Sequence, residues 1–108
     1  MWVNALRSKE YKQTKHSLRT TSDTYCCLGV LCDLYAKDSG NNLWQENSPY
    51  TNYTFDDHAG TLPECVVKWA EINNTGTYSF QGIETSLTVK NDQGFTFEQI
   101  AKLIEEHF

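Results

Sequence analysis

The chain has 108 residues, of which 39% are apolar and 21% charged, with a net charge of −5 and four cysteines. This length suits one domain and excludes two independent cores, and the composition excludes a disordered chain. No run approaches the roughly 18 apolar residues of a membrane helix, and the first residues lack the apolar core of a signal peptide. We therefore expect one cytoplasmic domain, residues 1–108, whose thiols stay reduced.

The charge is distributed unevenly along the chain. Residues 1–19 carry five basic side chains and one acidic one, a net charge of +4, whereas the remaining 89 residues carry −9. An isoelectric point near 5.0 disfavours binding to long nucleic acids, because most of the surface would repel a polyanion. A small anion would instead be attracted to the basic N-terminal segment.

The first predicted elements are two helices with a hairpin between them. Apolar side chains on one helical face predict a short helix over residues 2–7, and the polar, alternating run over 11–27 predicts a β-hairpin. Residues 27–38 have the apolar spacing of an amphipathic helix, which Gly40 would end. Gly29 inside this helix indicates a closely approaching backbone, because glycine otherwise weakens a helix.

The second half of the chain contains further helices and short strands. Residues 38–61 predict an ordered loop rich in aromatic side chains, or a pair of short strands. A helix is predicted over 63–72, a strand over 86–90 and a helix over 96–107, which opens with a Thr-x-x-Gln capping box. These elements predict an α+β fold in which a small antiparallel sheet packs against about three helices.

Three of the four cysteines lie within residues 26–32, and their spacing decides how they are interpreted. Cysteines five apart on a helix point away from each other, so Cys27 and Cys32 do not form the close pair that zinc needs. A catalytic thiol would need a base such as His16 nearby. We expect buried small side chains, with no metal and no cofactor, although these two alternatives stay open.

The basic segment is the candidate ligand site. Arginine and lysine neutralise phosphates, a glutamine can read a base or sugar edge, and an aromatic ring can stack on a base. The alternative is a solvated hairpin whose charges protect a strand edge from aggregation. The turn Asn91–Gly94 is better explained by turn chemistry and helix capping than by an anion-binding nest. The candidate ligand-binding residues are Arg7, Tyr11, Lys12, Gln13, Lys15, His16 and Arg19.

Four sequence motifs of the chain are YKQ, YCCLGVLCDLY, LPECVVKWA and NDQGFTFEQIAKLIEEHF. Through these motifs the chain resembles a family of short, mostly uncharacterised proteins encoded by bacteriophages and prophages. The resemblance covers most of the chain except residues 38–61. Relatives are rich in glycine directly after the glutamine, where this chain has Thr14–Ser17, so a positive φ there would be unfavourable. The resemblance implies a viral accessory protein in the host cytoplasm, of a kind that often counters host immunity.

From this resemblance and the basic segment, we expect a non-enzymatic protein that binds and sequesters a small phosphorylated, nucleotide-derived immune signal. Two alternatives stay open. One is an inhibitor that binds a host defence protein through the aromatic loop or the acidic remainder. The other is an enzyme that degrades such a signal, with Asp56, Asp57 and His58 as its acid–base or metal-binding groups. No heptad or obvious apolar patch identifies an interface, so the oligomeric state is open.

Overall fold

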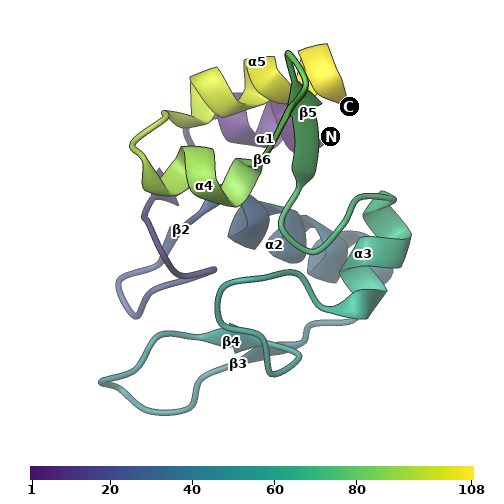
Figure 1. Ribbon diagram of the computed structural model, residues 1–108. Helices are drawn as coiled ribbons and strands as arrows, with labels where there is room; N and C mark the ends of the chain where they lie inside the picture. The colour runs from purple at the N-terminus through teal and green to yellow at the C-terminus, as the bar shows by residue number, and fades with distance from the viewer.

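The central helix α2, Cys27–Ser39, carries seven of the 24 buried residues and contacts α1, α3 and α4. In the computed structural model, which describes residues 1–108, it lies at the middle of the molecule (Figure 1). Gly40 ends α2 with a φ of 73°, as predicted. A Cβ atom on Gly29 would lie 1.8 Å from the carbonyl oxygen of Leu18, which confirms the predicted close approach of another backbone.

Four helices and six short strands surround α2. The opening helix, the capping-box helix and the helix after the proline are all found where the sequence predicts them. The remaining elements in chain order are α1 Trp2–Arg7, β1 Lys12–Gln13, β2 Thr24–Tyr25, β3 Trp44–Gln45, β4 Thr54–Phe55, α3 Glu64–Ala70, β5 Thr77–Phe80, β6 Ile83–Ser86, α4 Leu87–Asp92 and α5 Phe97–His107.

The strands form three separate two-stranded pairs. The hairpin predicted over residues 11–27 is wrong for β1 and β2, which run parallel, and antiparallel pairing within this range is limited to an isolated bridge between Arg19 and Tyr25. The physical reason is Leu18, which is fully buried and contacts Gly29 through its backbone, so the chain makes a wide detour between the two strands. The pairs β3–β4 and β5–β6 are antiparallel, and β3–β4 is the pair of short strands expected within the aromatic loop.

The strand predicted over residues 86–90 is also wrong, because these residues begin helix α4. The hydroxyl of Ser86 accepts a hydrogen bond from the Val89 N–H and caps the helix. Leu87 and Asn91 then lie four residues apart on one face, and both are buried. Burial of that face, together with the serine cap, outweighs the strand propensity of the Thr-Val sequence.

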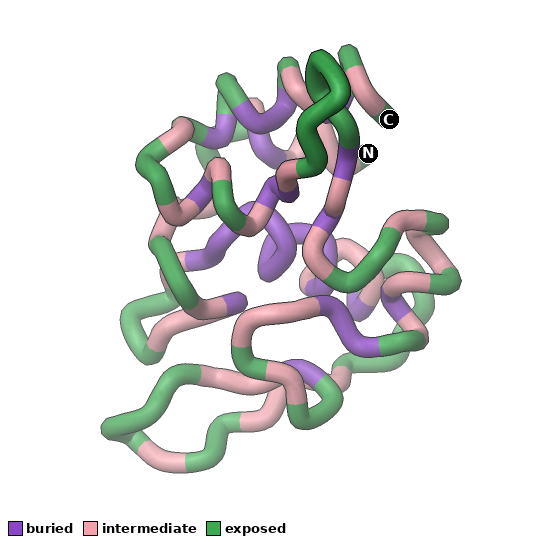
Figure 2. Tube along the Cα trace, viewed as in Figure 1, coloured by how far each residue is buried: buried purple, intermediate pink, exposed green.

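The α+β class is confirmed, with five helices and three short strand pairs in place of one sheet on three helices. Buried residues are concentrated in the first turns of α2, and others lie in α4 and α5 (Figure 2). The hairpin β5–β6 protrudes beside the C-terminus and is mostly exposed (Figure 2). None of the helices has the length and apolar character needed to cross a bilayer.

Candidate functional site

The basic segment lies across the turn between α4 and α5, and Gln13 fixes it there. The Nε2 atom of Gln13 donates to Asn91 Oδ1 at 2.9 Å and to the Phe95 carbonyl at 2.7 Å. Its Oε1 atom accepts from the Phe97 N–H at 3.0 Å, at the start of α5. Both donors of this amide are therefore used within the protein, and Gln13 positions the segment rather than reading a base edge.

Asn91 is the partner that completes this connection, and it is only 1% exposed. Its Nδ2 atom donates to the Thr14 carbonyl at 2.8 Å, and its Oδ1 atom also accepts from the Cys27 N–H at 3.2 Å, at the start of α2. We call these two side chains the Gln13–Asn91 hub. In the sequence Asn91 has the character of a turn residue, and its spacing of four from Leu87 is the signal that places it on a buried helical face.

The arginines of the segment are held by carboxylates. Arg7 lies 3.1 Å from Glu98 and 2.7 Å from Glu105, both on α5. Glu105 and Glu98 raise the pKa of Arg7 through hydrogen bonds and charge, against the opposing effect of burial, while the Arg7 hydrogen bond lowers the pKa of Glu105. These pairs are exposed enough to be worth little in stability, but they neutralise the charge of Arg7 toward a ligand.

Arg19 is enclosed by aromatic rings. Its Nε atom donates to Asp23 at 2.9 Å, and its guanidinium carbon lies 4.1 Å from the Tyr53 ring centroid. Trp44 and Tyr25 face the same guanidinium at 5.2 and 5.4 Å. Arg19 thereby connects the loop after β1 to the aromatic residues of the β3–β4 region, which is the role these aromatics have in the structure.

His16 adopts a left-handed conformation with φ of 68°. It lies within Thr14–Ser17, where a positive φ is unfavourable because the residues are not glycine. Asp92 compensates, because its Oδ1 accepts from the His16 N–H at 2.8 Å and its Oδ2 lies 3.2 Å from His16 Nδ1. His16 thus has an acidic partner, and it lies on the loop that the Gln13–Asn91 hub holds.

Three lysines of the basic segment remain without an acidic partner. Lys9, Lys12 and Lys15 are exposed, and none forms a salt bridge. Lys12 and Lys15 belong to the predicted ligand-binding residues, and Lys9 lies outside that set but in the same +4 segment. The positive charge that a ligand would meet therefore comes from these lysines.

Two grooves meet at Gln13, one on each side. The first has a volume of about 310 Å³ and is lined by Lys9, Tyr11 and Phe97 among others. The second has a volume of about 250 Å³, and Lys15 and Phe95 are among its lining residues. Each groove thus has one unpaired lysine and at least one aromatic ring, and both lie against the rigid hub.

The hydroxyl of Tyr11 takes part in a second cluster of polar side chains, around Asp33. It donates to Asp33 Oδ2 at 2.6 Å, while the Trp44 indole N–H donates to Asp33 Oδ1 at 3.1 Å and Lys37 lies 3.2 Å from the same carboxylate. Partial burial alone would raise the pKa of Asp33, but these hydrogen bonds outweigh it and lower that pKa. The Tyr11 ring is therefore fixed at the groove, with its edge-to-face partner Tyr25 at 5.0 Å.

The thiols near the hub are not available for chemistry. Cys27 and Cys32 are 0% exposed and Cys26 is 7% exposed, which confirms the interpretation as buried small side chains. Burial raises the pKa of Cys26 to about 11 and also raises the pKa of the other two thiols. At neutral pH these groups stay protonated, and a protonated thiol is a poor nucleophile.

The acidic turn that the enzyme alternative invokes follows β4. Asp56 and Asp57 have positive φ values of 49° and 67°, and His58 Nδ1 lies 2.8 Å from the Asp56 carbonyl. Asp57 accepts from the Gln45 side chain at 3.0 Å. These contacts are those of an acidic turn that is held to β3 by Gln45.

One protein-family model matches residues 1–108, and its description is "Domain of unknown function (DUF8296)". No curated protein and no solved structure matches the chain.

Proposed function

The chain belongs to the DUF8296 family, whose description names no function. From the charges and grooves of the basic segment, we propose that the protein binds and sequesters a small phosphorylated ligand of nucleotide size in the two grooves at Gln13. The observation that supports this most directly is which basic side chains of the segment have an acidic partner. The arginines and His16 are paired with carboxylates, whereas Lys9, Lys12 and Lys15 keep free ammonium groups on a segment that is held in place.

Lysines on a fixed backbone suit an anion better than lysines on a mobile arm. A mobile arm loses conformational freedom when it binds, whereas the Gln13–Asn91 hub has already ordered this segment. The aromatic rings of Tyr11 and Phe95 give a base or a sugar an apolar surface beside the charge. Two grooves with one lysine each would suit a ligand with separated phosphates.

Sequestration without turnover is supported by what the grooves contain. Their lining offers ammonium groups, amides and rings, which bind phosphates, and the carboxylate of Glu98 in the first groove is paired with Arg7 at 3.1 Å. The thiols nearby are buried with raised pKa values. The counter-defence setting, in which a phage protein removes a nucleotide signal in the host cytoplasm, rests on the sequence resemblance. It would give the binding site its biological purpose.

The test is calorimetric titration with ADP-ribose, a panel of cyclic dinucleotides and inorganic pyrophosphate. Replacing Lys9, Lys12 and Lys15 together by alanine should weaken binding at least tenfold, because Lys9 and Lys15, the lysines that line the grooves, lose their phosphate contacts. The matched control is Lys102→Ala on α5, an exposed lysine with no salt bridge, which should bind normally. Absence of binding to every probe, or equal binding by the triple variant, would refute the proposal.

A second candidate, a protein-binding inhibitor, is favoured by one observation. The tip of the β5–β6 hairpin exposes Phe80 by 51% and Ile83 by 71%, and Phe108 beside it is 46% exposed. Exposed apolar side chains gathered in this way are typical of protein interfaces. The replacement of Phe80 and Ile83 by threonine should abolish partner binding and leave nucleotide binding unchanged, whereas the triple lysine variant should do the reverse.

A further inference from the structure

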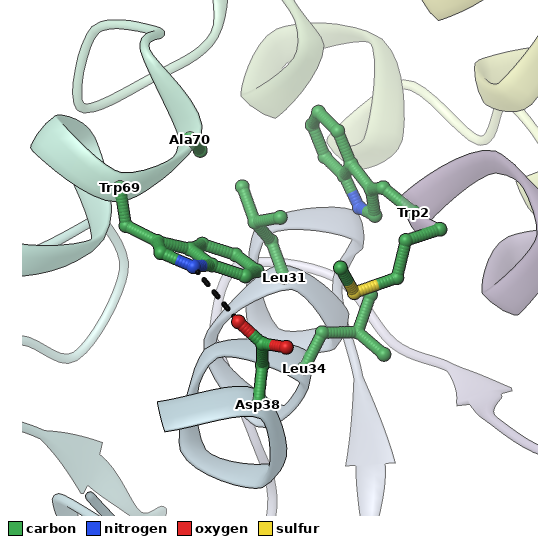
Figure 3. Close-up of a pocket in the computed structure, with 7 residues that line it drawn as sticks. Trp2, Leu31, Leu34, Asp38, Trp69 and Ala70 are labelled. Carbon is green, nitrogen blue, oxygen red and sulfur yellow. Dashed lines mark hydrogen bonds between the residues drawn. The ribbon is translucent and has the colours of Figure 1, made fainter. Parts of the chain in front are cut away.

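A pocket of about 340 Å³ lies between helices α1, α2 and α3, away from the two grooves. Figure 3 shows the rings of Trp2 and Trp69 on opposite sides of it, with Leu31 and Leu34 between them on α2. Six of its seven lining residues are apolar, and the seventh is Asp38. This volume falls at the lower end of the range for small-molecule sites, about 300 to 1,000 Å³.

The hydrogen bonds around the pocket determine which ligand chemistry it accepts. The Trp2 indole N–H donates to the Cys27 carbonyl at 3.0 Å, and the Trp69 indole N–H donates to Asp38 Oδ2 at 3.2 Å. Both side-chain donors are therefore used. The other carboxylate oxygen of Asp38 lies on the side of Leu34 (Figure 3), accepts no hydrogen bond from the protein and belongs to an exposed side chain at the rim of the pocket.

We propose that this pocket binds a small amine, a cation with an aromatic or aliphatic body. The free oxygen of Asp38 would accept a hydrogen bond from the ammonium group and balance its charge. The two indole faces would contact the apolar body and attract the cation through their π electrons. An anion would meet a carboxylate with no side-chain donor to offset it.

The helix termini around the pocket add to the negative potential. Asp38 lies in the last turn of α2, and Trp69 and Ala70 lie in the last turn of α3, where the helix dipole is negative. The nearby lysines do not oppose it, because Lys37 pairs with Asp33 at 3.2 Å and Lys68 pairs with Glu64 at 3.0 Å. The pocket thus has the opposite charge preference to the grooves at Gln13.

The experiment uses three probes that share a phenyl body: 2-phenylethylamine, 2-phenylethanol and 3-phenylpropanoate. The indole N–H signals of Trp2, Trp44 and Trp69 are followed by NMR, with Trp44 as an internal reference because it lies outside the pocket. The amine should shift the Trp2 and Trp69 signals and bind at least tenfold more tightly than the alcohol, with the carboxylate weakest. The Trp44 signal should stay in place.

Asp38→Asn separates charge from shape, because the amide oxygen can still accept from Trp69. This variant should lose about tenfold in amine affinity and keep its affinity for the alcohol. Glu46→Gln, which removes an exposed charge in the β3 region outside the pocket, is the matched control and should bind the amine normally. Amine binding that is unchanged in Asp38→Asn, equal binding of the alcohol or carboxylate, or no shift at Trp2 and Trp69 would each overturn the proposal.

Discussion

Replacing Asn91 by alanine tests whether the Gln13–Asn91 hub determines stability. This substitution deletes three hydrogen bonds at a residue that is 1% exposed: one to the Thr14 carbonyl, one from the Cys27 N–H and one from Gln13. Each is worth about 1 kcal/mol net, and buried groups left without a partner cost about 1 to 3 kcal/mol each. We expect a total loss of about 3 to 4 kcal/mol, out of about 5 to 15 kcal/mol for a domain of this kind.

The measurement is urea unfolding followed by tryptophan fluorescence. With a slope of about 1 to 3 kcal/mol per molar, the midpoint should fall by at least about 1 M. The control is Asn52→Ala, which removes an exposed side chain whose single hydrogen bond goes to Ser17 at 2.8 Å, and it should cost about 0.5 kcal/mol. If Asn91→Ala is no more destabilising than this control, the hub does not have the energetic role assigned to it.

Three further predictions concern the rest of the molecule. Gly29→Ala should destabilise by more than about 3 kcal/mol or prevent folding, because the added Cβ lies 1.8 Å from the Leu18 carbonyl oxygen, as a thermal melt would show. A colorimetric thiol reagent at pH 8 should react quickly with one thiol, that of half-exposed Cys65, and with all four only after denaturation, since burial raises the pKa of the others. Asp33→Asn should be less stable than the natural protein at pH 7, and the difference in free energy of unfolding should be smaller at pH 3. The pKa of Asp33 is lower in the folded protein than its unfolded value of about 3.9, so its ionised form adds stability above that value. This stability is lost as the pH falls through the pKa of the folded protein.

The helices were predictable wherever the signal was local. The capping box at Thr96, the glycine that ends α2 and the apolar spacing of α2 and α5 are short-range patterns, and each marks the observed element. Gly29 was also informative, because a glycine inside a buried helix has few explanations other than close packing.

Two of the errors arose where distant contacts decide the local structure, whereas helix α4 was missed although its Ser86 cap is a local signal. The detour that buries Leu18 makes β1 parallel to β2, and no pattern within residues 11–27 contains that information. In the same way, the burial of Asn91 depends on partners that lie 64 to 78 residues away in the chain. Sequence periodicity describes one element at a time, so it cannot identify a polar side chain that joins several elements.

For the candidate site, the sequence identified the segment but not which of its basic residues pair with carboxylates and which stay unpaired. Spacing and charge pointed to residues 7–19, and the unpaired lysines lie there. Whether a basic residue has an acidic partner depends on residues brought near by the fold, as with Arg7 and Glu105. The structure therefore distinguishes residues that position the segment from lysines that can face a ligand.

The contacts of Gln13 also constrain when the chain can fold during its synthesis. Its partners at Asn91, Phe95 and Phe97 lie 78 to 84 residues later in the sequence. At about 5 to 20 residues per second, the ribosome needs several seconds to translate that interval, and closing such a long loop is slow. The hydrogen bonds of Gln13 can therefore form only after the start of α5 has been synthesised, so a chain that terminates before residue 97 should lack the Phe97 contact and be more open to proteolysis.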